Sequence, residues 1–406
     1  MQTFLSAAER EFIRDHLTND VRGLLLRKNL AGLDLKRLVA QIASRQKARE
    51  KLPTWYANDA LIFPPALSVE QASSERTAHY KALLVSGNVL LDLTGGMGVD
   101  TWAFAQRVGQ VIYVERNAEL AKVSAYNLTQ LGVANVTVYP TDGLSLLDNE
   151  ASDWLTEPAD WIYLDPHRRD EQGGKVIRLE DCEPDLSKAQ TISRLLKKAN
   201  QVLLKTSPLL DIDATVRQLN GAVDAVHVVA VQGEVKEVLF VLGKQNISLE
   251  AVQIQAVNLL PDRTVRMAFR WYEERTANVS FGDPQQYIYE PNAAVLKAGA
   301  FRLVAERFEL TKLAPNSHLY TSNVLRTDFP GRVFRLQAVL KPDVKTLKTE
   351  VPALKANLTV RNFPQSVAEL RKKLNLREGG DIYILATTLL NTDKRLLITR
   401  KVESAH

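Results

Sequence analysis

The feature that most constrains the fold is a glycine-rich turn between an apolar strand and a helix. The run Val89 to Leu93 predicts a buried strand with an acid, Asp92, near its end, and a helix begins at Val99. Glycine lacks a Cβ atom, so the backbone of such a turn can approach a ligand closely and direct its N–H groups toward it. The turn therefore predicts a site for a nucleoside or an anion, with Thr94, Gly95, Gly96 and Gly98 as candidate binding residues.

Short apolar runs alternate with amphipathic helices from residue 88 onward, which predicts a parallel sheet with right-handed crossovers. The last two runs, Ala225 to Val231 and Val235 to Leu242, are separated only by Gln232 to Glu234, and so short a connection forces an antiparallel hairpin. The predicted fold is therefore α/β, a Rossmann-like sheet of the class I methyltransferase type with an antiparallel last strand. Its other strands are expected at Val89–Leu93, Val111–Val114, Val136–Tyr139, Trp161–Leu164 and Val202–Leu204.

Breaks in this pattern divide the chain into three parts. A helical N-terminal region is expected over residues 1–68, where Ser6 and Glu9 have the spacing of a capping box. A polar helix from Glu70 to Lys81 then leads into the methyltransferase domain, which we place at residues 69–245. The mixed pattern of strands and helices that follows predicts an α+β domain at residues 246–406.

Three acids fit S-adenosylmethionine (SAM) as the ligand of the turn; the position of Glu115 fits a dinucleotide equally well, whereas Asp92 favours SAM. Glu115 ends the next strand 23 positions after Asp92 (115 − 92), near the spacing of about 20 for an acid bonded to ribose hydroxyls. Asp92 would repel a pyrophosphate but suits the cationic amino group of methionine. Asp142, after the third strand, is placed to accept a hydrogen bond from the adenine amino group. Glu115 or Asp142 taken singly could instead cap a helix.

The candidate reaction centre is the run Asp165-Pro166-His167-Arg168-Arg169 at the end of the fourth strand, the edge at which open α/β sheets bind ligands. It resembles the Asp-Pro-Pro-Tyr motif of SAM-dependent amino methyltransferases. The resemblance implies that Asp165 and the Pro166 carbonyl orient an exocyclic amine toward the methyl group. His167 and Arg168 stand where that motif has its second proline and its aromatic residue, so no aromatic ring is provided for stacking on the target base.

A second interpretation uses four residues at the same sheet edge. Lys81, Asp165, Lys205 and Glu237 follow the order of the Lys-Asp-Lys-Glu tetrad of ribose 2′-O methyltransferases, in which a lysine deprotonates the hydroxyl. An ordinary ion pair between Lys205 and Glu237 would explain part of the same pattern. Methylation at C5 of a pyrimidine is excluded, because no cysteine follows the fourth or fifth strand and Cys182 lies between two acids.

Composition indicates which kinds of site, location and substrate to expect. One cysteine and six scattered histidines predict neither a disulfide nor a metal site, and no window is apolar enough for a membrane span, so a cytoplasmic protein is expected. The formal net charge is +5, but residues 331–406 hold 15 Lys and Arg against 7 Asp and Glu. A basic segment beside a catalytic domain favours a substrate with phosphates, although such a surface can also be only solubilising.

Taken together, several motifs resemble bacterial SAM-dependent methyltransferases with a C-terminal THUMP-like domain, which are described as RNA methylases. The resemblance covers nearly the whole chain and implies RNA as partner, with a ferredoxin-like and a THUMP-like piece in the C-terminal domain. Its basic residues Arg371, Lys372, Lys373 and Arg377 are either phosphate contacts or a solvated helix face. The motifs are Lys47–Pro53, Glu70–Ala78, Asp92–Gly98, Asp165–Arg169, Tyr289–Ala294 and Asn357–Pro364.

The segment Ser73-Ser74-Glu75 also resembles the Thr-Pro-Glu step that precedes the cofactor loop of trimethylguanosine synthases. That resemblance implies that Ser73 and Glu75 touch SAM. Ser74 stands where that family has proline, so only the two flanking residues carry over.

We therefore expect a SAM-dependent methyltransferase that acts on RNA at an exocyclic or ring nitrogen of a base. Ribose 2′-O methylation is the alternative, and a SAM-fold RNA-binding protein without catalysis is a third reading. The RNA, the nucleotide and the oligomeric state stay open. The residues expected to act in catalysis are Asp165, Pro166, His167, Arg168, Lys205 and Glu237.

Overall fold

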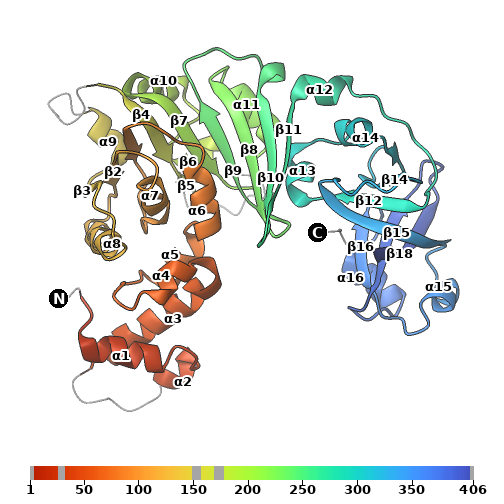
Figure 1. The fold of residues 1–406 in the computed structure, drawn as a ribbon, viewed down its shortest axis with the longest axis horizontal. Coiled ribbons are helices and arrows are strands. Elements are labelled where there is room, and N and C mark those ends of the chain that lie inside the picture. Colours follow the sequence, from red (N-terminus) through yellow and green to blue (C-terminus); the bar gives the residue numbers. More distant parts are fainter. Residues whose placement is uncertain (1–3, 26–32, 149–156, 169–177, 403–406) are drawn as a thin grey trace. The chain divides into compact units, whose positions relative to one another are not determined.

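The structure of the chain is a computed structural model that describes residues 4–25, 33–148, 157–168 and 178–402 (Figure 1). The chain divides into two compact units. Unit 1 comprises residues 1–224 and 238–247, and unit 2 comprises residues 225–237 and 248–406.

The N-terminal helices of unit 1 begin where capping signals predict. The side chain of Ser6 accepts from the backbone N–H of Glu9, and Glu9 accepts from the backbone N–H of Ser6, which completes the expected capping box. The single helix expected from Glu70 to Lys81 is instead broken, because Ser74 caps a new helix start through a bond from Thr77 N. The helices are α1 (Ala7–Asp15), α2 (Val21–Leu25), α3 (Leu35–Lys51), α4 (Pro53–Ala57), α5 (Ala66–Gln71) and α6 (Glu75–Ala82).

The sheet of unit 1 has the order β9-β7-β4-β1-β2-β3. Neighbours from β7 to β3 are parallel, whereas β9 runs antiparallel to β7, which confirms the predicted methyltransferase arrangement. The strands are β1 (Val89–Asp92), β2 (Gln110–Val114), β3 (Val136–Tyr139), β4 (Ala159–Leu164), β7 (Ala199–Thr206) and β9 (Glu234–Leu242). The helices between them are α7 (Val99–Phe104), α8 (Ala118–Gln130), α9 (Gly143–Asp148), α10 (Ala189–Lys198) and α11 (Ile212–Gln218).

The hairpin that reverses the chain joins β8 (Val223–Val231) to β9 through Gln232 and Gly233. Both turn residues have positive φ, 52° and 85°, as the twist-matched two-residue hairpin turn requires. At the open end of the hairpin, Gly243 N donates to Ala222 O over 2.9 Å. The predicted antiparallel connection is therefore present, with a turn one residue shorter than expected.

Unit 2 is a mixed α+β structure, as predicted. β10 (Gln253–Leu259) pairs parallel with β8 and antiparallel with β11 (Thr264–Arg270). A separate seven-stranded sheet has the order β13-β14-β12-β15-β18-β17-β16. Its strands are β12 (Tyr287–Pro291), β13 (Thr311–Lys312), β14 (Tyr320–Ser322), β15 (Gly331–Leu340), β16 (Asn357–Arg361), β17 (Ile382–Thr388) and β18 (Lys394–Lys401). The helices of unit 2 are α12 (Trp271–Thr276), α13 (Ala293–Ala298), α14 (Leu303–Arg307), α15 (Val344–Glu350) and α16 (Val367–Lys373).

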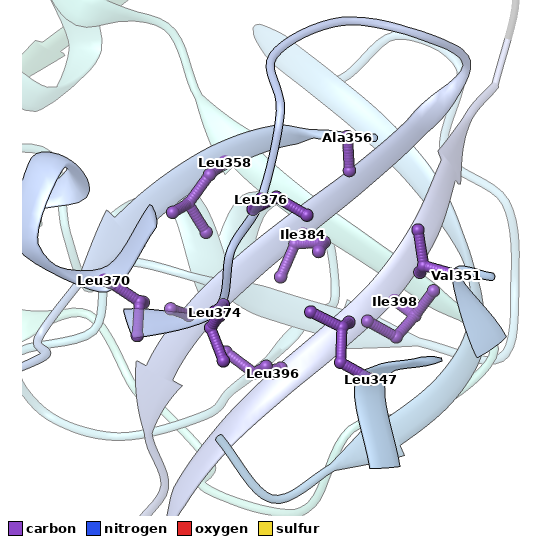
Figure 2. Packing of buried hydrophobic residues seen from close by; sticks show 11 residues of the cluster. Leu347, Val351, Ala356, Leu358, Leu370, Leu374, Leu376, Ile384, Leu396 and Ile398 are labelled. Atoms are coloured by element: carbon purple, nitrogen blue, oxygen red, sulfur yellow. The ribbon is translucent and has the colours of Figure 1, made fainter. Parts of the chain in front are cut away.

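The end of the seven-stranded sheet has an aliphatic core of its own (Figure 2). Leu347 of α15 and Leu370 of α16 are fully buried against Ile384 of β17 and against Leu396 and Ile398 of β18. Branched aliphatic side chains without polar atoms can fill such a core at crystal-like density. This packing holds α16, which carries the basic residues Arg371, Lys372 and Lys373, against the sheet.

Candidate active site

A cavity of about 680 Å³ lies in unit 1 at the carboxyl ends of β1, β2 and β4. Its size falls in the range of small-molecule and cofactor sites. The sequence-predicted residues that line it are Ser73, Asp92, Thr94, Gly95, Gly96, Gly98, Glu115, Asp142, Asp165 and His167. Of the other predicted residues, Glu75, Lys81, Pro166, Lys205 and Glu237 are not in its described wall.

Two different constraints require glycine in the turn: lack of space at Gly95 and a positive φ at Gly96 and Gly98. A Cβ atom on Gly95 would lie 2.2 Å from a ring carbon of Tyr113, and Gly96 and Gly98 have φ angles of +54° and +84°. The carbonyl of Gly96 accepts hydrogen bonds from Tyr113 Oη at 2.7 Å and Ser124 Oγ at 3.1 Å. Because these bonds fix the turn, its backbone is already arranged for a ligand before one arrives.

Glu115 and Asp142 each hold a backbone N–H and also face the cavity. Glu115 accepts from Gly96 N at 2.9 Å through Oε2 and from Asn117 N at 2.7 Å through Oε1. Asp142 Oδ1 accepts from Ser145 N at 2.9 Å, so it caps the start of α9. A carboxylate has about four lone-pair positions, so both acids retain capacity for a ligand.

Asp92 is fully buried at the inner wall of the cavity. Its Oδ1 accepts from Thr94 N at 3.1 Å and its Oδ2 from Thr101 Oγ1 at 2.5 Å, so both of these partners are neutral. Burial raises the pKa of Asp92 to about 7; the two hydrogen bonds oppose this shift, and the charges of Asp100 and Asp165 add to it. Asp92 can therefore gain or lose a proton near neutral pH.

Asp100 is a second buried acid in the wall, and the sequence motifs did not point to it. Its Oδ2 accepts from Ser73 Oγ at 2.8 Å and Tyr163 Oη at 2.7 Å, and its Oδ1 lies 3.2 Å from Lys81 Nζ. Burial raises its pKa, but the charges of Lys81 and Lys205 and the two hydroxyl bonds lower it overall. Asp100 is thus held ionised by its surroundings. The sequence feature that could have indicated Asp100 is its position as an acid in the first turn of the helix after the glycines.

Asp165, at the end of β4, forms the second lysine–carboxylate pair. Lys205 Nζ donates to Asp165 Oδ2 over 2.5 Å, and the backbone N–H of Asp165 donates to Thr94 Oγ1 over 2.7 Å. The Asp165 side chain is 35% exposed, whereas that of Lys205 is 12% exposed. Asp165 therefore reaches the cavity, with a cation behind it.

The two lysines of the proposed Lys-Asp-Lys-Glu tetrad belong to two separate ion pairs. Lys81 pairs with Asp100, and Lys205 pairs with Asp165. Glu237 is buried in β9 at 2% exposure, next to Val238, which pairs with Thr206 across the ladder. A shared role for the four residues stays a prediction.

The residues after Asp165 form a short antiparallel pair, β5 (His167–Arg168) with β6 (Cys182–Glu183). Arg116 donates to Glu183 Oε1 over 2.9 Å and lies 2.9 Å from His167 Nε2. His167 is exposed in this cluster and Pro166 is partly exposed. The Arg168 side chain and Arg169 lie outside the described residues.

Ser73 and Glu75, two neighbours expected to touch SAM, are placed differently. Ser73 lines the cavity and donates to Asp100. Glu75 is buried and accepts from Thr54 N at 2.7 Å and from Trp55 N at 3.2 Å, so its carboxylate caps the start of α4. The structure brings only Ser73 to the cavity.

Neither a metal cluster nor a membrane helix is found in the parts of the chain that the structure describes. No group of three His, Cys, Asp or Glu residues there is arranged to hold a metal ion. None of the described helices is long and apolar enough to cross a membrane. Cys182 is a buried free thiol.

Three known families match successive segments of the chain. Residues 62–152 match the protein-L-isoaspartate (D-aspartate) O-methyltransferase family, residues 287–330 match a ferredoxin-like domain, and residues 331–401 match a THUMP domain-like family. The ferredoxin-like match begins at β12, and the THUMP-like match covers β15 to β18.

Two relatives match most of the chain. A candidate methyltransferase from Porphyromonas gingivalis W83, known from a crystal structure, is 35% identical, with a TM-score of 0.86 and 98% of each chain covered. An uncharacterized S-adenosylmethionine-dependent methyltransferase, found in two strains of Mycobacterium tuberculosis, is 21% identical over 325 residues, which are 79% of this chain and 83% of the relative.

Proposed function

Because this chain belongs to the family of SAM-dependent methyltransferases with ferredoxin-like and THUMP-like domains, we propose that it methylates RNA at an exocyclic or ring nitrogen of a base. The observation that carries the proposal is Asp165, which lines the cavity and is held by Lys205. A hydrogen-bond acceptor at this position would orient the target amine.

The volume and the lining of the cavity accord with SAM. Gly95 to Gly98 would give the methionine part a close backbone approach, Glu115 would bind the ribose hydroxyls, and Asp142 would accept from the adenine amine. The described wall is acidic, because it holds seven carboxylates and two Lys or Arg side chains: Asp92, Asp100, Glu115, Asp142, Asp165, Glu183 and Asp185 against Arg116 and Lys188. SAM carries one net positive charge, which suits an acidic cavity.

In the proposed reaction, SAM supplies an electrophilic methyl group on its sulfonium. Asp165 accepts a hydrogen bond from the target amine, and the Pro166 carbonyl is expected to accept a second. These two acceptors turn the nitrogen lone pair toward the methyl group, so most of the catalysis is positioning. As the nitrogen bonds the methyl carbon, the bond from that carbon to sulfur would break and S-adenosylhomocysteine would be released. The nitrogen would then lose its proton, which the Asp165 carboxylate would accept. Lys205 holds that carboxylate in place through their ion pair.

RNA is proposed as the substrate because of the THUMP-like segment and the charge of the C-terminal residues. Of the four basic residues in and just after α16, Lys372 and Lys373 are exposed, while Arg371 pairs with Glu378 over 2.8 Å and Arg377 donates to Ala353 O over 3.1 Å. The two lysines are therefore the better candidates for phosphate contacts. A cytoplasmic location accords with this substrate.

Ribose 2′-O methylation is the second candidate, favoured by the lysine that touches Asp165. In that reading Lys205 removes the proton from the ribose hydroxyl. A non-catalytic RNA-binding protein would not need Asp165 and its lysine at the rim of the cofactor cavity.

Substitutions at Asp165 and Lys205 distinguish these readings. We expect Asp165→Ala to abolish methyl transfer and to change SAM affinity less than about threefold, because the acid orients the acceptor and not the cofactor. Asp165→Asn retains one acceptor oxygen and should keep partial activity. Lys205→Met should reduce methyl transfer, and the remaining label should still be on the base. Loss of all transfer in Lys205→Met, with wild-type label on ribose, would establish the 2′-O reading instead.

A further inference from the structure

Two sequence motifs that the cofactor cavity does not use meet in unit 2 around Glu290. Arg361, the last residue of β16, donates from Nε to Glu290 Oε1 over 3.0 Å. Arg332 lies directly opposite Glu290 in the ladder between β12 and β15, and its Nε donates to Glu290 Oε2 over 2.9 Å. A terminal nitrogen of Arg332 also bonds Oε2. Two arginines from different strands are thus tied to one carboxylate.

The acid is buried, but both cations reach the surface. The Glu290 side chain is 2% exposed, whereas those of Arg332 and Arg361 are 43% and 36% exposed. Within the described part of the chain, Glu290 is the only acid paired with either arginine. One guanidinium would neutralise the carboxylate, so the second leaves an excess positive charge at the same place.

The bonds to Glu290 also decide which N–H groups stay available. A guanidinium presents five N–H donors in a rigid planar fork. Among the residues that the structure describes, Arg361 donates a hydrogen bond only from Nε, so the edge formed by its two terminal nitrogens is bonded to none of them. Arg332 is held further by Thr359 Oγ1 at 3.4 Å and by the ring of Phe334, 5.4 Å from its guanidinium carbon. Both forks are therefore oriented before any ligand binds, which lowers the entropic cost of binding.

A further positive charge, that of Lys312, acts in the surroundings of Arg361. Burial, together with the positive charges of Lys312 and Arg361, lowers the pKa of His318 to about 4. His318 is consequently neutral at physiological pH and adds no charge of its own. An anion near Arg361 meets a positive field from more than one side chain.

We propose that Arg332 and Arg361 form a phosphate-binding fork that holds the backbone of the RNA substrate. The inference rests on the proposed function, since RNA is the polyanion this enzyme is proposed to meet. The planar edge formed by the two terminal nitrogens of Arg361 suits phosphate oxygens in a two-point contact, and Arg332 adds the donors of its Nη1. Such contacts fix the position of the RNA without reading its bases.

The test measures binding of a fluorescein-labelled, mixed-sequence 20-nucleotide single-stranded RNA to the full chain over a series of KCl concentrations. Arg361→Gln and Arg332→Gln should each weaken binding at low salt. The slope of log affinity against log salt should become shallower by about 0.7 for each phosphate of a single strand that the variant no longer neutralises. Arg361→Lys retains the charge without the fork and should fall between wild type and Arg361→Gln.

The matched control is Arg263→Gln, which removes the same charge from an arginine that is 47% exposed and pairs with Asp262 in the turn between β10 and β11. Urea unfolding checks that each variant is folded. RNA affinity and salt slope in the Arg332 and Arg361 variants equal to those of the control would overturn the proposal and leave the arginines as a clasp for Glu290.

Calorimetry with pyrophosphate on the same variants separates RNA from a small phosphorylated ligand. Weaker RNA binding by the fork variants supports the proposal. Loss of pyrophosphate binding with unchanged RNA binding would assign the fork to a small phosphorylated ligand and overturn the RNA assignment.

SAM and RNA binding by the wild-type chain distinguish a failure of this proposal from a failure of the proposed function. If the wild-type chain binds SAM by calorimetry but binds no RNA, the RNA function itself fails. If the wild-type chain binds RNA and the fork variants bind it equally well, only the fork fails.

Discussion

Asp92 and Asp100 lie in the wall of one cavity, yet their surroundings move their pKa values in opposite directions. Burial dominates at Asp92, whose two hydrogen-bond partners are neutral, and raises its pKa to about 7. At Asp100 burial is outweighed by Lys81, Lys205, Tyr163 and Ser73, and the pKa is lowered. Groups with divergent pKa values beside a ligand cavity are typical of functional sites.

Cofactor binding should therefore depend on pH through Asp92. Without ligand, a carboxyl with a pKa of about 7 is mostly protonated at pH 6 and mostly ionised at pH 8. The cationic end of SAM favours the ionised form, so SAM affinity should rise about tenfold from pH 6 to pH 8 and then level off. Calorimetry over this range measures the effect, and Asp92→Asn should bind more weakly and without this dependence. His167→Gln, which removes the histidine of the cavity, should leave the pH dependence unchanged.

The same pKa shift predicts the sign of a stability change. The folded protein binds a proton at Asp92 that the unfolded chain, with a pKa of about 4 for aspartate, has already released. The contribution of Asp92 to the free energy of unfolding is therefore fully present below about pH 4, falls as pH rises toward 7, and is lost above it. Urea unfolding of wild type and Asp92→Asn without SAM compares the two. Equal dependence on pH in both proteins would contradict the assignment.

At this scale the sequence predicted acids that line the cavity but not their network. Asp92, Glu115 and Asp142 follow strands directly, so their convergence on one sheet edge could be predicted from the topology. Asp100 meets Ser73 and Tyr163 through contacts 27 and 63 positions apart, which no local pattern indicates.

Among the elements, strands were more predictable than helix boundaries. Short apolar runs identified the parallel strands because both faces of such a sheet are buried. The expected helix from Glu70 to Lys81 is divided into α5 and α6 because Ser74 caps a new start, a local bond that competes with helix continuation. The parallel pairing of β8 with β10 connects residues about 30 positions apart and has no local signature.

Glu75 provides a test at the level of elements, because its carboxylate caps α4. Glu75→Ala removes the acceptor from two backbone N–H groups and should lower the free energy of unfolding by about 1 to 3 kcal/mol. Glu75→Gln keeps an acceptor oxygen and should cost less. In the folded fraction, SAM affinity should be nearly that of wild type. A tenfold or larger loss of affinity without a change in stability would favour the cofactor contact implied by trimethylguanosine synthases.

At the scale of the whole molecule, the proposed cofactor site and the proposed RNA contacts belong to different units of the chain. The cofactor cavity belongs to unit 1, and the THUMP-like match and the phosphate fork belong to unit 2. The α+β character of the C-terminal region was predictable from its mixed pattern and from the family resemblance. The meeting of Glu290 with Arg332 and Arg361 was not, because the three residues lie on separate strands.

The most direct test of the central claim uses RNA from a strain that lacks this protein. The purified chain is incubated with that RNA and methyl-labelled SAM, and the RNA is then digested to nucleosides. We predict label on a base nitrogen of one nucleoside, present with wild type and absent with Asp165→Ala. Label on ribose would move the reaction to the 2′-hydroxyl, and RNA left unlabelled by a chain that binds SAM would contradict the proposed substrate.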